Sequence, residues 1–150
     1  MTQIMIDFRQ YGPWIVTHKG DRACRYLADR HYSRQTPGSN QFCRPGENLV
    51  LRTAPGDALW VTWSGIRDDG LQAWECTHFR NESNHLSSDM IRAAVTATIE
   101  KWGVPPKDGL ITYVDASKIK STNPGCCFKA AGWRHIGESK RRGLTLLQLK

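Results

Sequence analysis

Three side chains that can accept or donate a proton follow predicted elements of regular structure. His31 and Tyr32 follow a predicted helix, and Asp115 follows the short apolar run of residues 110–114. An imidazole titrates near neutral pH, and open α/β sheets usually bind ligands at the carboxyl ends of their strands. Such a set can take a proton from an attacking group. The structural alternative is that Asp115 caps a turn and His31 closes a helix, with Tyr32 in the core.

A second group of polar residues precedes the long predicted helix MIRAAVTATIEKW, residues 90–102. The amino terminus of a helix presents unpaired backbone N–H groups and a positive dipole end, which suits a phosphate group. Arg80 adds positive charge there, and Ser87 and Ser88 add hydroxyl donors. The alternative is an ordinary helix with Ser87 or Ser88 as its N-cap. Asp89 opposes anion binding because its carboxylate competes for the same dipole.

Basic residues gather around these candidates. The formal net charge is +7 and the pI is about 9.4, which favours a polyanionic partner such as nucleic acid. Lys and Arg at the mouth of a site would neutralise phosphates and make binding salt-dependent. The alternative is ordinary solvated charge. The residues expected to contact such a partner are Arg30, Arg34, Arg44, Lys118, Lys120, Lys140, Arg141 and Arg142.

Hydrophobic periodicity and turn residues predict the elements that position these groups. Apolar residues at helical spacing, among them Ala23, Tyr26 and Leu27, predict a helix over residues 19–30 with these side chains inward. Residues 35–47 are rich in Gly and Pro and predict a loop. The predicted strands are residues 3–8, 13–16, 48–53, 58–64, 71–79, 110–114, 133–138 and 144–149, with a short helix at 125–131.

Length and composition predict a single domain over residues 1–150 with one core, of the α/β (α+β) class. The odd number of cysteines, five, and the absence of a C-x-x-C pair favour free thiols and no structural metal. No stretch has the length of a membrane span or the pattern of a signal peptide. We therefore expect a soluble, cytoplasmic protein; the sequence does not fix its oligomeric state.

The order of predicted elements is similar to that of the GNAT acetyltransferase superfamily. The segment Phe128-Lys129-Ala130-Ala131-Gly132-Trp133 resembles its closing aromatic-x-K-x-G-aromatic motif. Three segments resemble the Mom-like branch, phage-encoded GNAT-type enzymes that modify DNA bases. They are residues 30–34 (RHYSR), residues 81–87 (NESNHLS), and residues 113–115 (YVD) followed by Gly125 and the closing motif.

The resemblance implies a mixed, mostly antiparallel sheet flanked by helices, and acetyl-CoA or another acyl-CoA as the acyl donor. The strand over residues 71–79 would pair with the pantetheine arm, and residues 110–115 would splay away from it. Residues implied in cofactor binding are Arg80, Ser83, His85, Ser87, Ser88 and Phe128. Ser83 and His85 stand where the family usually has glycine or alanine, and Phe128 replaces a tyrosine that often serves as the general acid.

In the reaction that the resemblance implies, Asp115 orients or deprotonates the attacking amine, with His31 as the second choice. Tyr32 protonates the leaving thiolate or binds the acceptor. A free alkyl ammonium has a pKa of about 10, so the amine must lose a proton before it attacks. The favoured acceptor is an amine of a modified base in DNA, with an aminomethyl group on a pyrimidine as the easiest chemically. Two alternatives are a small-molecule or protein amine, and a DNA-binding module without catalysis.

Overall fold

The computed structural model describes residues 11–29, 42–115, 125–140 and 142–150. Its strands are β1 (Trp14–Val16), β2 (Glu47–Thr53), β3 (Ala58–Ser64), β4 (Trp74–Asn81), β5 (Leu110–Val114), β6 (Arg134–Glu138) and β7 (Thr145–Leu149). Its helices are α2 (Arg22–Asp29), α3 (Ser87–Trp102) and α4 (Cys126–Ala130).

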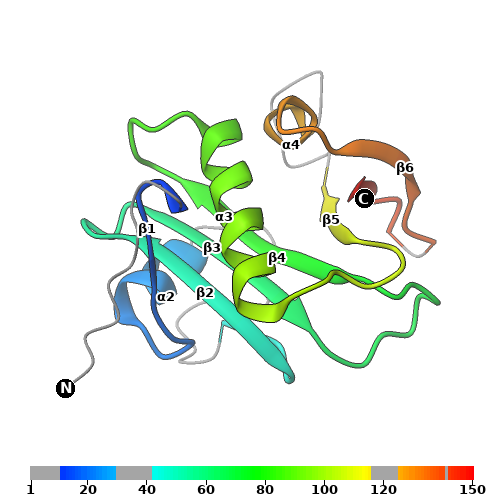
Figure 1. Cartoon of the computed structure of the whole chain (residues 1–150), viewed down its shortest axis with the longest axis horizontal. Helices are drawn as coiled ribbons and strands as arrows, with labels where there is room; N and C mark the ends of the chain where they lie inside the picture. The colour runs from blue at the N-terminus through cyan, green and yellow to red at the C-terminus, as the bar shows by residue number, and fades with distance from the viewer. Residues whose placement is uncertain (1–10, 30–41, 116–124, 141) are drawn as a thin grey trace.

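The strands form one open sheet in the order β1-β2-β3-β4-β5-β7-β6 (Figure 1). Every neighbouring pair is antiparallel except β4 and β5, which are parallel. The predicted α/β class with a mostly antiparallel sheet is therefore confirmed, including the meander of β2, β3 and β4. None of the described helices is long and apolar enough to cross a membrane.

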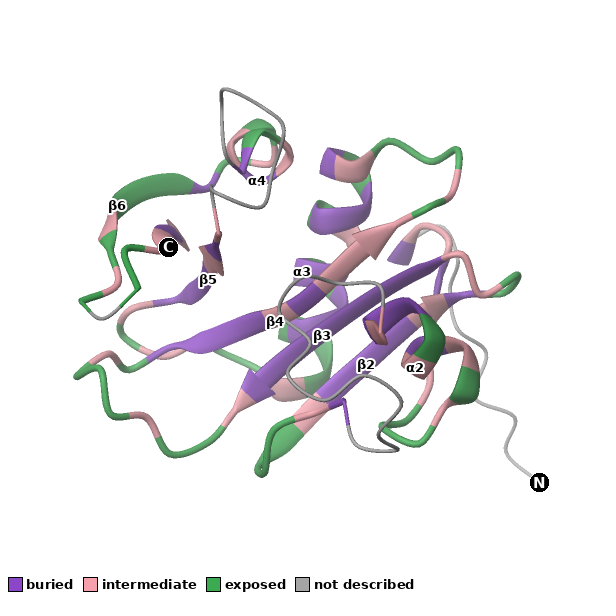
Figure 2. Ribbon diagram, turned by 180° about the vertical axis from the view of Figure 1, so that it is seen from behind, coloured by how far each residue is buried: buried purple, intermediate pink, exposed green. Residues whose placement is uncertain are grey.

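The sheet has an apolar cluster on each face, because successive side chains of a strand alternate between faces. In β3, Trp60 packs with residues of α3 and α4, whereas Val61 packs with residues of α2. Figure 2, seen from the α2 side, shows buried residues along β2, β3 and β4. Both faces of the central strands are therefore covered, α3 and α4 on one side and α2 on the other.

The outward side of α2 differs from the prediction. Cys24, Leu27 and Ala28 are its buried residues, whereas Tyr26 is 50% exposed. The predicted helix is confirmed over Arg22–Asp29, but its buried side does not follow the apolar spacing of Ala23, Tyr26 and Leu27. Taking Cys24 as the first inward residue gives the observed spacing i, i+3, i+4.

The strand β4 begins at Trp74, three residues later than the predicted start at Leu71. The amide of Leu71 donates to the Asp69 carboxylate, and the amide of Gln72 donates to the Asp108 carboxylate. These carboxylates accept hydrogen bonds from the two amides in place of a neighbouring strand, so strand pairing begins later in the sequence. Such contacts depend on Asp108, which lies 36 residues further along the chain than Gln72, and periodicity cannot detect them.

In the turn before β5, the backbone conformation and the surroundings of Gly109 both disfavour a side chain. Gly109 has φ +69°, and a Cβ atom there would lie 2.2 Å from the carbonyl oxygen of Leu149, whereas Gly70, with φ +79°, has no atom within 4 Å. Both positions disfavour an L side chain by about 1 to 2 kcal/mol, but only Gly109→Ala also forces backbone apart. We expect Gly109→Ala to lower the free energy of unfolding by at least about 2 kcal/mol more than Gly70→Ala, measured by urea denaturation. Equal losses would contradict the described packing of β5 on β7.

Candidate active site

The parallel strands β4 and β5 pair over a short distance and then separate. Their register comprises two residue pairs, Trp74 with Leu110 and Glu75 with Ile111. One residue further along each strand, the hydroxyl of Thr112 donates to the carbonyl of Cys76 at 2.9 Å. Residues 77–81 of β4 therefore have no strand partner on this side among the described residues. An extended chain can use such a free strand edge through main-chain hydrogen bonds.

A β-bulge lies where the strands separate. Opposite β3, Cys76 pairs with Thr62 and His78 pairs with Val61, so Thr77 is an extra residue in β4. Bulges interrupt the ladder and redirect backbone groups, and they are frequent next to active sites. The hydroxyl oxygen of Thr77 is buried and has no hydrogen-bond partner among the described residues. The bulge thus concentrates unpaired polar groups at the point of divergence.

An aromatic cluster joins α4 to the sheet beside this point. The ring of Phe128 lies 5.9 Å from that of Phe79 in β4 and 5.0 Å from that of Trp133, measured between centroids. Phe128 is only 6% exposed. Its ring therefore anchors α4 in the core, and its role in cofactor binding stays a prediction.

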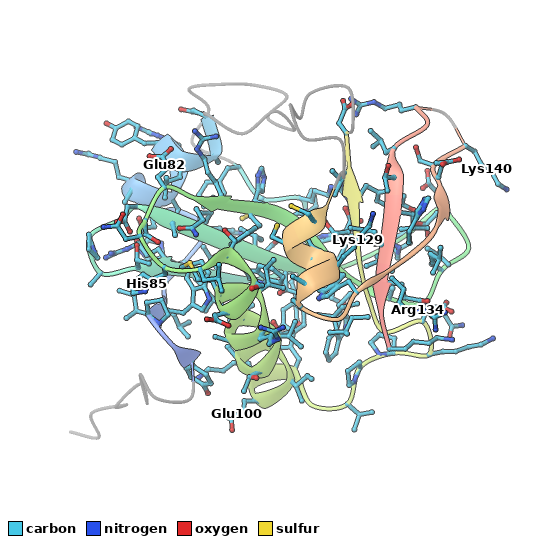
Figure 3. The ribbon with its side chains drawn as sticks, turned by 90° about the horizontal axis from the view of Figure 1, so that it is seen from above. Glu82, His85, Glu100, Lys129, Arg134 and Lys140 are labelled. Atoms are coloured by element: carbon cyan, nitrogen blue, oxygen red, sulfur yellow. The ribbon has the colours of Figure 1, made fainter. Side chains whose placement is uncertain are left out.

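The loop between β4 and α3 is organised by Asn81. Its amide nitrogen donates to the carbonyl of His85 at 2.8 Å and to the hydroxyl of Ser87 at 2.9 Å. Its amide oxygen accepts from the backbone and hydroxyl of Ser83. The exposed side chain of His85 lies on this loop (Figure 3). One amide side chain therefore fixes the loop that the resemblance assigns to phosphate binding.

The start of α3 has no side-chain cap. Leu86 occupies the N-cap position without a capping hydrogen bond, and the first helical bond runs from the amide of Met90 to the carbonyl of Leu86. The prediction that Ser87 or Ser88 is the N-cap was wrong, because Asn81 holds the Ser87 hydroxyl and Ser88 is buried. By helix geometry the amides of residues 87–89 lack helical acceptors. They can donate to an anion, although Asp89 weakens the attraction.

Arg80 does not stand as an isolated cation beside this helix start. Its guanidinium donates to the carboxylate of Glu82 at 2.5 Å, and both side chains are about one-third exposed. The pair is neutral overall. Arg80 would therefore have to exchange Glu82 for a phosphate in order to bind one.

Asp115 and the β6–β7 hairpin come together in space. The guanidinium of Arg142 lies 4.0 Å from the Asp115 carboxylate, whose side chain is 13% exposed, whereas that of Arg142 is 66% exposed. Lys140 is exposed on the same hairpin (Figure 3). The structure thus joins the predicted catalytic carboxylate to a cation predicted to bind DNA. The other predicted residues His31, Tyr32, Arg30, Arg34, Lys118, Lys120 and Arg141 lie outside the described residues.

A network of charged groups that the sequence did not predict surrounds Glu75. One carboxylate oxygen of this buried side chain accepts from Arg44 at 3.1 Å and from Arg67 at 3.0 Å. Both guanidiniums also lie about 5 Å from the centre of the Trp63 ring. Arg44, expected to contact nucleic acid, is thus tied to β4, although its side chain is 54% exposed. In the sequence, the charged Glu75 between Trp74 and Cys76 could have indicated a buried ion pair, but nothing local identifies its partners.

The network continues to β5 through Asp69. Arg67 forms a salt bridge with Asp69, and the hydroxyl of Tyr113 donates to the same carboxylate at 3.0 Å. The hydrogen bond from Arg67 lowers the pKa of Asp69 to about 2, against partial burial that raises it. Burial and the bond to Asp69 raise the pKa of Tyr113 to about 12. Tyr113 is therefore a neutral donor that ties β5 to the β3–β4 loop.

No known protein family, curated protein or solved structure matches this chain. Within the described residues, no three His, Cys, Asp or Glu side chains gather as a metal site would require. The features of the described residues that bear on function are therefore the geometry of the β4–β5 divergence and the chemistry of the residues around it.

The Asp69 network predicts a dependence of stability on pH. Because its folded pKa is about 2, Asp69 stabilises the fold above its ordinary pKa of about 4, and this contribution is lost as pH falls toward 2. Between pH 5 and 2 we expect wild-type protein to lose roughly 1 to 2 kcal/mol more unfolding free energy than Asp69→Asn. Urea titrations across this range measure it, with exposed Asp68→Asn as the control. The same pH profile for Asp69→Asn and wild type would contradict the network.

Proposed function

We propose that this protein is an acyl-CoA-dependent N-acyltransferase of the GNAT type, which acetylates an amine of a modified base in DNA. The observation that carries the proposal is the divergence of β4 and β5 after two residue pairs, with a β-bulge at Thr77. Among the described residues, this divergence leaves the edge of β4 beyond Cys76 without a strand partner on the β5 side. Helices α3 and α4 on one face and α2 on the other agree with the arrangement expected for the family.

The described residues fit an acyl-CoA in two respects. The free edge of β4 offers main-chain hydrogen bonds to the amides of a pantetheine arm. The uncapped start of α3 offers the amides of residues 87–89 to a pyrophosphate. Asp89 and the Arg80–Glu82 pair reduce the positive charge there. We therefore expect binding to depend more on backbone donors than on arginine. The bound molecule supplies the thioester-linked acyl group.

The role of Asp115 in the transfer follows from its position just after β5. Its carboxylate accepts a hydrogen bond from the acceptor ammonium and takes its proton, directly or through water. The amine then forms the new C–N bond as the C–S bond to CoA breaks; the nitrogen gives its second proton to solvent, and the departing thiolate takes one from solvent. Phe128 cannot supply this proton because its ring carries no acidic group. Backbone N–H groups at the bulge hold the carbonyl oxygen as it gains negative charge.

Cations near Asp115 support a polyanionic acceptor. Arg142 and Lys140 lie on the adjacent hairpin, and Arg44 exposes half of its side chain. The net charge of +7 also favours a polyanionic acceptor. An aminomethyl group on a pyrimidine C5 already projects into the major groove, so the duplex need not be opened to reach it. The nitrogen of such an alkyl amine is also not conjugated with the base.

Mass spectrometry of nucleosides tests the proposal. DNA containing an aminomethyl pyrimidine, and ordinary DNA, are incubated with the protein and acetyl-CoA. We expect one acetyl group to be added to the amine-bearing base alone. Asp115→Asn should slow this addition at least about 100-fold, because the base is lost, while its affinity for acetyl-CoA stays within about twofold.

The matched control is Glu138→Gln, which removes an exposed carboxylate from β6, the first strand of the β6–β7 hairpin. It should acetylate DNA at the wild-type rate. Acetylation of free small amines with DNA left unchanged would refute the DNA acceptor but keep the acyltransferase. DNA binding without measurable affinity for acetyl-CoA would refute both and favour a DNA-binding module.

A further inference from the structure

The exposed side of α2 and the turn before it carry positive charge together with an aromatic ring. Arg22, Arg25 and Tyr26 share one side of the helix at spacing i, i+3 and i+4. Lys19 precedes them in the adjoining turn. Lys19 and Arg22 are exposed, Arg25 is partly exposed and Tyr26 is half exposed. We call these four residues the α2 surface.

Two cations of the α2 surface, Lys19 and Arg22, are not paired with described carboxylates. Asp21, which lies between them, is turned inward: it accepts from the Thr17 hydroxyl at 2.6 Å, from Arg52 at 2.8 Å and from the Cys24 amide at 3.1 Å. Partial burial raises the pKa of Asp21, but these hydrogen bonds outweigh it and lower the pKa to about 2. Its carboxylate is therefore already engaged by Thr17, Arg52 and the Cys24 amide.

Arg25 and Tyr26 add a second kind of contact. The guanidinium carbon of Arg25 lies 5.3 Å from the centre of the Tyr26 ring. This arrangement keeps a charged group over an aromatic face that is half exposed to solvent. Lys and Arg interleaved with an exposed aromatic ring suit a nucleic acid, whose phosphates and bases offer charge and flat apolar surface together.

The fold does not need these side chains. Cys24, Leu27 and Ala28 supply the packing of α2 on β2 and β3, and the four residues of the α2 surface point away from that contact. Selection for packing therefore does not account for three cations and a tyrosine on this side.

The α2 surface also has a suitable position relative to the candidate active site. Helix α2 covers the face of the sheet opposite α3 and α4, and the α2 surface is the outer side of this layer (Figure 2). In β5, Ile111 and Tyr113 belong to a cluster separate from that of α3, and Asp115 follows two residues after Tyr113. A nucleic acid lying along α2 would therefore approach from the side of Asp115, while the α3 start stays open to the acyl donor.

We propose that the α2 surface binds the phosphate backbone of the DNA that carries the acceptor base. This inference rests on the proposed DNA acceptor and names a part of the protein outside the catalytic groups that would hold it. The α2 helix, eight residues long, spans about 12 Å. Duplex DNA carries a charge about every 1.7 Å along its axis, so several phosphates are within reach of the three cations.

The test measures binding of a short labelled duplex to the full chain at several salt concentrations. In one variant Lys19, Arg22 and Arg25 are all replaced by Gln. If each cation contacts a phosphate, the slope of log K against log salt should become shallower by about 2.7, and binding at low salt should weaken at least about tenfold. A double variant, Lys19→Gln with Arg22→Gln, leaves the Arg25–Tyr26 contact intact and should show about two-thirds of this change.

The control replaces three exposed lysines by Gln, Lys101, Lys107 and Lys150, which are remote from α2 in the fold. It lowers the net charge by the same amount and should leave the slope nearly unchanged. Equal losses in both triple variants would show a general charge effect and overturn the proposal. A wild-type slope in the α2 variants would overturn it as well.

A second measurement separates this inference from the proposed function. The α2 variants should acetylate a free aminomethyl nucleoside at the wild-type rate and lose activity only on DNA. If no acyl transfer occurs with any variant or acceptor, the proposed function fails, and the salt slopes still decide whether the α2 surface binds DNA. Replacement of Tyr26 by Ala should weaken binding with no change in slope, because the ring carries no charge.

Discussion

The pairing of β4 with β5 limits what the rest of the structure can do. Parallel pairing holds for two residues and is then closed off by the bond from Thr112 to the Cys76 carbonyl. Beyond that point β4 keeps its antiparallel partner β3, while β5 keeps β7. Each half of the sheet therefore keeps its own antiparallel ladder. A sheet that loses its backbone hydrogen bonds in the middle must be held together by other interactions. Side-chain contacts around the divergence supply them.

Two different kinds of interaction span the divergence, one on each face. On the α3 side, Phe128 of α4 packs with Trp60 and Phe79, and Arg92 of α3 donates to the carbonyl of Ala130. This contact is mainly apolar and joins α4 to the β3–β4 half. On the other side, the Glu75 and Asp69 network joins that half to Tyr113 of β5. The buried carboxylate of Glu75 needs its arginine partners, since an unpaired buried charge is strongly destabilising. Side-chain contacts on both faces of the sheet therefore surround the point where β4 and β5 separate.

Charge is distributed unevenly between the two faces. Around the α3 start, Arg80 is paired with Glu82, and Asp89 adds negative charge, so the attraction for an anion comes from backbone amides. On the other face the exposed Lys19 and Arg22 are not paired with described carboxylates, and Arg142 is mostly exposed. This difference agrees with two ligands that approach from opposite sides, one held by main-chain donors and one by screened charge–charge attraction.

The sequence by itself determined most of the elements, because alternation and helical spacing are local properties. The residues of β3 and β5 and the end of α3 at Trp102 were predicted to the residue, whereas α3 begins at Ser87, three residues before the predicted start. It also singled out Asp115 and Arg142. Only the tertiary structure decided what touches what: that Arg142 faces Asp115, that Asn81 holds Ser87, and that Arg44 and Arg67 share Glu75. These contacts join residues from separate elements, and no spacing rule along one chain encodes them. The divergence of β4 from β5 is likewise set by how far two separate strands can pair, which depends on the packing of α3, α4 and β7 around them.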